Sequence, residues 1–133
     1  MGDLHSGSCL CGQVRFRLDG AVERFFLCHC ERCRKGSGSA HGANLFSSTM
    51  SITWLSGQDS VRLFNLPQTR HSRAFCESCG SALPWSQGRM LVVPAGCLDT
   101  ALDRVPDAHL FMASRAHWDH DLAALPAFAG MPA

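Results

Sequence analysis

The chain has 133 residues, which is enough for one domain with a hydrophobic core and short for two. A hydrophobic share of 46% is that of an ordinary globular protein and excludes wholesale disorder. The formal net charge of +1 argues against a dedicated nucleic-acid or membrane surface, and no apolar run is long enough to cross a bilayer. We therefore expect one domain spanning residues 1–133 that binds neither nucleic acid nor membrane.

Short β-strands separated by turn residues dominate the pattern along the chain. Residues 13–18 alternate polar and apolar side chains, with Val14, Phe16 and Leu18 on one face, and Asp19-Gly20 then signals a turn. Strand character follows in six further segments: residues 24–30, 40–48, 51–57, 60–66, 72–76 and 90–98. Pro94 indicates that the last of these segments lies near a sheet edge or ends there.

The C-terminal part of the chain has a different character. Residues 107–114 predict extended chain, and residues 115–128 contain at most a short helix that Pro126 would end. The whole pattern predicts a mainly β fold, mostly antiparallel, with one or two short helices. A sheet of this size has a limited core, so bound metal ions would help to stabilise it.

The eight cysteines fall into three clusters and the single residue Cys97. In a reducing cytosol, where we expect this protein, so many cysteines are more readily explained by metal than by disulfides. Alternate residues of a strand point to the same face, so Cys9 and Cys11 can offer two sulfurs to one ion. Cys76-x-x-Cys79 followed by glycine is typical of a zinc knuckle, because glycine accepts the left-handed conformation of that turn.

A structural zinc ion takes four soft ligands, and the simplest closed site combines two of these clusters: Cys9, Cys11, Cys76 and Cys79. Cys28, Cys30 and Cys33 remain, and three protein ligands with a free fourth position are the arrangement of a catalytic zinc. Spacing leaves two alternatives open. The trio could share a closed site with Cys76 or Cys79, or the thiols could form a disulfide framework.

Four pieces of the sequence, in this order, resemble the glutathione-dependent formaldehyde-activating enzyme family, which includes centromere protein V. They are "GSCLCGQVRF", "CHCERCRKGSGSA", "FCESCGSAL" and the tail "PDAHLFMASRAHW…LPAF", and they run from about Gly7 to Phe128. The resemblance implies a β-tent fold built around two zinc ions. It also implies a structural zinc on the four-cysteine set above and a second, catalytic zinc on Cys28, Cys30 and Cys33.

The resemblance further implies a carbon–sulfur lyase that forms or breaks an adduct between glutathione and formaldehyde. We expect the free zinc position to bind a thiol such as glutathione or to polarise an aldehyde oxygen. Arg34 and Lys35, beside the second cluster, could hold glutathione carboxylates, and His41 could face the pocket. Two other functions remain alternatives: a non-catalytic zinc module that binds a partner, and a redox sensor that releases zinc on oxidation.

Two further residues have open roles. In an extended segment the His29 side chain would point away from a metal bound by its neighbours, so it is either a hydrogen-bonded structural histidine or a proton carrier. Cys97 has no neighbouring cysteine and is either a small buried hydrophobe or a fourth ligand to the second zinc.

Overall fold

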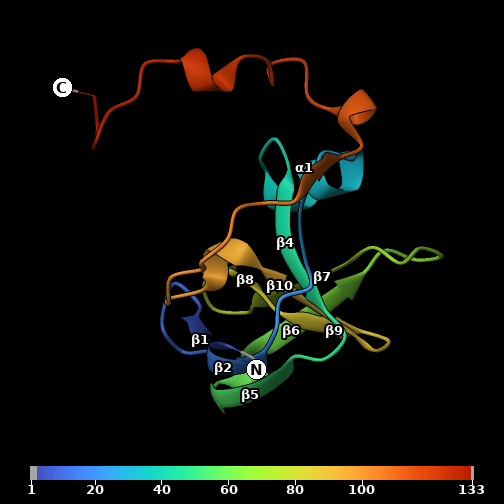
Figure 1. The fold of residues 1–133 in the computed structure, drawn as a ribbon. Helices are drawn as coiled ribbons and strands as arrows, with labels where there is room; N and C mark the ends of the chain where they lie inside the picture. Colours follow the sequence, from blue (N-terminus) through green and yellow to red (C-terminus); the bar gives the residue numbers. More distant parts are fainter. Residues whose placement is uncertain (1–2, 133) are drawn as a thin grey trace.

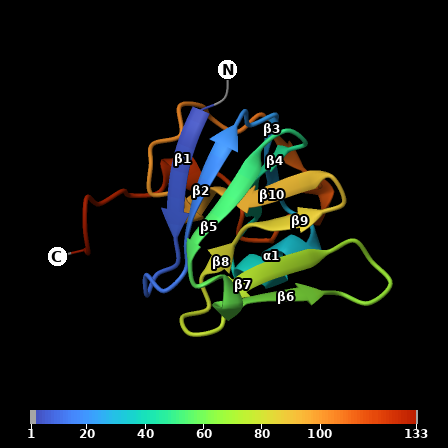
Figure 2. The same cartoon turned by 90° about the horizontal axis from the view of Figure 1, so that it is seen from below.

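The computed structural model describes residues 3–132 and contains three β-sheets (Figure 1). The first sheet has the antiparallel order β1-β2-β5. Its strands, seen side by side in Figure 2, are β1 (Asp3–Ser8), β2 (Arg15–Gly20) and β5 (Ser51–Ser56). Polar and apolar residues alternate along β2 as the sequence predicts, so one face of this sheet is buried and the other meets solvent.

The second sheet has five strands in the order β11-β3-β4-β10-β9. Its strands are β3 (Arg24–Cys28), β4 (Gly42–Ser47), β9 (Trp85–Gln87), β10 (Met90–Pro94) and β11 (Ala108–Leu110). The β11–β3 pair is parallel, and the other pairs are antiparallel. Pro94 is the last residue of β10, as expected for a residue that cannot donate to the sheet. The third sheet is antiparallel and consists of β6 (Val61–Asn65), β7 (Ser72–Cys76) and β8 (Ala82–Leu83).

The helical elements are short, as predicted, but the α-helix lies outside the tail segment in which the sequence allowed a helix. The α-helix α1 (Glu31–Ser37) directly follows the CHC segment, and it ends at Gly38 in the left-handed conformation. The remaining helical turns are of the 3₁₀ type: η1 (Gln58–Ser60), η2 (Ala95–Cys97), η3 (Met112–Ser114) and η4 (Leu122–Ala124). The tail therefore contains single turns where the sequence allowed a short helix.

The core lies between the sheets. Val14, Phe16 and Leu18 are fully buried, which confirms the face predicted from their alternation. Phe16 meets Trp54 of β5 edge to face, with ring centroids 5.8 Å apart. Burying a side chain of this size contributes about 1.5–3 kcal/mol. The mainly β fold with few short helices is thus confirmed, and its apolar stripe on β2 anchors the core.

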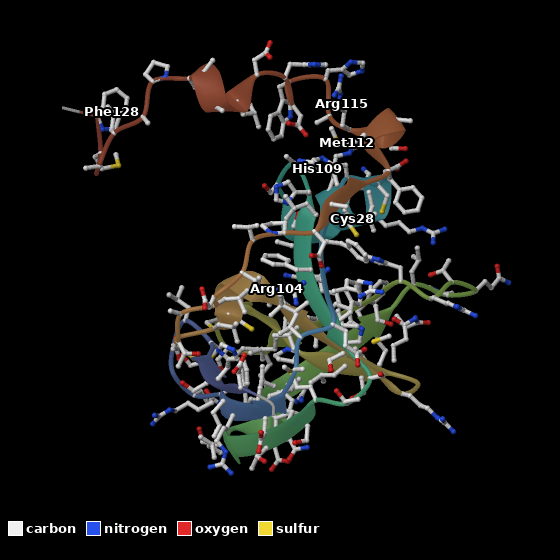
Figure 3. The ribbon with its side chains drawn as sticks, viewed as in Figure 1. Cys28, Arg104, His109, Met112, Arg115 and Phe128 are labelled. Carbon is white, nitrogen blue, oxygen red and sulfur yellow. The ribbon has the colours of Figure 1, made fainter. Side chains whose placement is uncertain are left out.

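The tail leaves the sheets after β11, passes α1 and runs away from the body of the molecule (Figure 1). Figure 3 shows Phe128 far from Cys28, and Phe128 is largely exposed. Within residues 3–132, no helix is both long and apolar enough to cross a lipid bilayer.

Candidate metal centres

The first cysteine cluster joins two turns that are distant in the sequence. Cys9 and Cys11 lie in the turn after β1, and Cys76 and Cys79 lie where β7 turns toward β8. The four sulfur atoms lie within 4.8 Å of one another. Each turn contains a glycine with positive φ, Gly12 at +81° or Gly80 at +76°, which is the conformation a tight knuckle needs. The fold therefore brings together the four thiols that the sequence assigned to one closed site.

The donor set and its spacing suit a zinc ion. Four sulfurs bound to one Zn²⁺ at about 2.3 Å would lie about 3.8 Å apart. The Cys9–Cys11 and Cys11–Cys76 sulfur distances, 3.5 Å and 4.0 Å, bracket that value. Hydrogen bonds, the largest from the Ser81 hydroxyl, lower the pKa of Cys79 to about 5 and favour the thiolate that a metal requires. The Leu10 amide also donates to the Ser81 hydroxyl at 2.8 Å and ties the two turns together.

The second cluster is local in sequence. Cys28 ends β3, Cys30 caps the N-terminus of α1, and Cys33 lies in the first turn of that helix. Their sulfurs also lie within 4.8 Å of one another, and among residues 3–132 no fourth thiol, imidazole or carboxylate joins this group. The cap explains the geometry, because the Cys33 amide donates to the Cys30 sulfur at 3.4 Å and turns the chain tightly.

The electrostatics of this cluster favour a cation among the thiols. Burial, and then the neighbouring Cys28 thiol, raises the pKa of Cys33. Three close thiolates repel one another, so deprotonating all of them near neutral pH requires a positive charge between them. A divalent zinc ion supplies that charge, and the trio fits a zinc with one position left for another ligand. Cys97 belongs to neither cluster; burial raises its pKa to about 12, and it packs against the core.

His29 is held by the tail rather than exposed to solvent. Its backbone amide donates to the Leu110 carbonyl at 2.9 Å, and its side chain is 2% exposed. The ring nitrogen Nε2 lies 2.8 Å from Nδ1 of His109, and Nδ1 lies 3.0 Å from a carboxylate oxygen of Asp119. Burial lowers the pKa of His29 despite the opposing effect of Asp119, so the ring favours the neutral state. His29 thus connects the CHC segment to β11 and to the chain beyond it.

The residues expected to bind substrate lie in different surroundings. Lys35 lines a cavity of about 910 Å³ that also reaches Cys30. The Arg34 guanidinium donates to the Ser114 carbonyl at 3.2 Å and so contacts the tail. The His41 ring packs edge-on against His29, with centroids 5.0 Å apart. The structure therefore places Lys35 at a cavity, Arg34 at the tail and His41 in the histidine group.

Two cavities border the second cluster, and sequence analysis identified neither. The cavity that reaches Cys30 is also lined by Arg32, Arg73 and the aromatic ring of Phe111. A second cavity, of about 420 Å³, reaches Cys33 and is lined by Arg70, Arg73, Trp85 and Phe46 among others. Within residues 3–132, none of the cationic side chains at these cavities is in an ion pair: Arg32, Lys35, Arg70 and Arg73.

His71 stands between the two cavities and lines both. Burial, and then the charge of Arg32, lowers the pKa of its imidazole. Arg70 and His71 come from the chain between β6 and β7, and Arg73 comes from β7, about forty positions beyond the CHC segment. Over such a distance, residue spacing carries no signal. Likewise, the β11–β3 pairing brings His109 to His29, and Asp119 reaches His29 from the chain beyond β11.

The fold and the two thiol clusters define a small mainly β protein with two groups that could hold metal ions. A family model for the glutathione-dependent formaldehyde-activating enzyme matches residues 4–114. A Halomonas elongata protein named for that same enzyme is 32% identical over 130 residues, covering 86% of this chain and 79% of its own length. The chain therefore belongs to the glutathione-dependent formaldehyde-activating enzyme family.

A solved structure supports the fold independently. The crystal structure of a Rhodobacter sphaeroides protein is similar with a TM-score of 0.54, and the match covers 76% of this chain and 97% of that one. The two sequences are 20% identical, so this likeness concerns the fold alone.

Proposed function

We propose that this protein is a zinc-dependent carbon–sulfur lyase that joins an aldehyde to a thiol such as glutathione, and that also catalyses the reverse reaction. The observation that carries the proposal is the second cluster: three thiols with no fourth side-chain ligand among residues 3–132, bordered by two cavities. The family match and the name of the Halomonas elongata relative support the thiol and the aldehyde as substrates. The four-thiol cluster is proposed to hold a structural zinc.

The reaction balances without an oxidant or a further reactant. The thiol sulfur forms a bond to the carbonyl carbon, the carbonyl π pair moves to oxygen, and the proton lost by the thiol is matched by one gained at that oxygen. A zinc ion held by Cys28, Cys30 and Cys33 would supply a Lewis-acidic position that favours a thiolate or polarises a carbonyl group.

The surrounding residues supply binding and orientation. Arg32 and Lys35, which line the larger cavity without ion-pair partners in the described chain, suit the two carboxylates of glutathione. Phe111 adds an aromatic ring to the wall of the cavity. The contacts of His29 with His109 and Asp119 fix the backbone that carries Cys28 and Cys30, so they orient the thiols.

The test uses Cys30→Ser, with Cys97→Ser as the matched control because Cys97 lies in neither cluster. Turnover is measured by NMR exchange between free aldehyde and thiol adduct, above the rate without enzyme. We expect Cys30→Ser to lose about one zinc per chain and roughly 100-fold in turnover, whereas Cys97→Ser keeps both. If Cys30→Ser retains its zinc content and its turnover, the proposal is wrong.

A further inference from the structure

The cavity at Cys33 is far larger than formaldehyde requires. Its volume of about 420 Å³ lies within the range of roughly 300–1,000 Å³ that is usual for pockets holding drug-sized ligands. Formaldehyde has two non-hydrogen atoms and would leave most of this space empty. The cavity borders the same thiol cluster that the proposed reaction uses, so its excess volume indicates a substrate larger than formaldehyde.

Small residues keep this cavity open beside the thiol. Gly36, Gly42, Ala43 and Ala82 all line it. A Cβ atom added at Gly42 would lie 3.5 Å from Cβ and 3.7 Å from Sγ of Cys33, so the absence of a side chain leaves that thiol facing open space. Larger residues at these four positions would reduce the cavity volume, and one at Gly42 would fill the space next to the sulfur.

The two cavities share a wall but meet different thiols. Gly36, His71 and Arg73 line both of them, whereas Cys30 lines only the larger cavity and Cys33 only the smaller. A reaction that joins two substrates at one cluster needs a separate place for each substrate. The larger cavity, with Arg32 and Lys35, is the better place for an anionic thiol.

The lining of the smaller cavity suits an aromatic body. Trp85, Phe46, Val92 and Pro94 provide apolar and aromatic surface. Arg70 and Arg73 also line the cavity and bring guanidinium groups, which can stack on aromatic faces, to its wall. Apolar walls with guanidinium groups at their edge favour a planar ring over a small polar carbonyl compound.

We propose that the cavity at Cys33 receives the body of an aldehyde larger than formaldehyde, of the aromatic class, while the thiol occupies the cavity at Cys30. This inference rests on the proposed function. The chemistry is the same addition: the thiol sulfur bonds to the carbonyl carbon of an aromatic aldehyde, the π pair moves to oxygen, and a proton is gained there as the thiol loses one.

The experiment compares two stable thioethers of glutathione in the zinc-loaded full chain by calorimetry. S-methylglutathione resembles the formaldehyde adduct and S-benzylglutathione resembles the adduct of an aromatic aldehyde. We expect the benzyl compound to bind at least tenfold more tightly. The ratio of the two affinities is compared within each variant, so a general change in thiol binding cancels.

Ala43→Phe fills the cavity, and we expect it to reduce the affinity ratio to about twofold or less. Ala43→Ser is the matched control of similar size and should keep the ratio. Trp85→Ala removes an aromatic wall and should lower the ratio even if Ala43→Phe folds poorly. Zinc content and thermal unfolding are measured for every variant.

The outcomes separate this inference from the proposed function. If both thioethers bind with equal affinity, the proposal of an aromatic aldehyde substrate is wrong, whereas the proposed binding of glutathione is unaffected. If the benzyl preference survives in both Ala43→Phe and Trp85→Ala, the assignment to this cavity is wrong. If neither compound binds the zinc-loaded protein, the proposed function fails and this inference fails with it.

Discussion

The two cysteine clusters are built from the same side chain but lie in different surroundings. The first connects turns that are distant in sequence, since Cys11 and Cys76 are 65 positions apart, and it has four thiols. The second lies within Cys28–Cys33, has three thiols, and borders two cavities with unpaired cations among the described residues. A cluster that closes a long loop and completes its own ligand set can stabilise a fold, whereas an incomplete set beside a cavity can bind a substrate.

The largest expected effect comes from opening the closed cluster. Cys76 is fully buried, and Cys76→Ser would remove one ligand from the proposed structural zinc. Zinc binding at such sites supplies about 10–16 kcal/mol in small domains, so we expect the unfolding midpoint to fall by roughly 10 °C or more. Calorimetry with zinc analysis checks this. A midpoint within about 2 °C of the parent protein would show that the first cluster does not hold the fold together.

A second test concerns the packing around the loop that carries the first cluster. Gly57 has φ +71°, and an added Cβ would lie 2.2 Å from the carbonyl oxygen of Gln13. Gly57→Ala should therefore cost about 2–4 kcal/mol in the free energy of unfolding, measured in urea. Gly12→Ala is the control, because Gly12 has a similar φ of +81° with open space around it, and should cost about 1 kcal/mol. If both variants lose the same free energy of unfolding, the positive φ determines the cost and the close contact at Gly57 adds nothing.

A third test concerns the contact between the tail and the second cluster. His109→Ala removes the partner of the buried His29 ring, and we expect a loss of about 1–2 kcal/mol that is concentrated at this end of the molecule. Hydrogen exchange should quicken at the His29 amide, which donates to Leu110, and stay unchanged at the Phe16 amide in the core strand. Uniform quickening at both amides would contradict a local role for the tail.

The smallest expected effect is a pH dependence at the start of β3. The Phe25 amide, and then Arg104, lowers the pKa of Asp107. A lowered folded-state pKa gives stability that is present above the unfolded value of about 3.9 and is lost as pH falls through the folded value. Asp107→Asn should thus be less stable than the parent protein at neutral pH and should approach it as the pH falls below about 4. Urea unfolding at several pH values measures the difference in the free energy of unfolding between the two proteins. A difference that does not change with pH would contradict the role of Asp107.

Local sequence patterns predicted part of the fold and part of the candidate site. Alternation along β2 predicted the buried face of Phe16. The spacing of the cysteines suggested the two thiol groups that the fold brings together but left other pairings open, and the family resemblance implied these two groups. That they bind zinc stays a prediction. The other features depend on long-range pairing. The parallel β11–β3 contact puts His109 beside His29, and the β6–β7 hairpin carries Arg70 and Arg73 to the cavity at Cys33. No local period records such contacts.

The α-helix after the CHC segment was missed for a local reason. Its sequence includes Gly36, a poor helix former, and its cap is Cys30 rather than a usual capping residue. In the structure the Cys30 sulfur takes the capping role by accepting the Cys33 amide. The thiol arrangement and the helix therefore depend on the same short turn.

The central claim is that one cluster is closed and the other keeps a free position, and zinc K-edge X-ray absorption tests it most directly. The account predicts two zinc ions per chain, one bound by four sulfurs and one by three sulfurs and a lighter atom, so a mean of about 3.5 sulfurs per zinc. Adding glutathione should raise the mean toward about 4 as its thiol takes the free position. One zinc per chain, or a mean of about 4 before any thiol is added, would contradict the account.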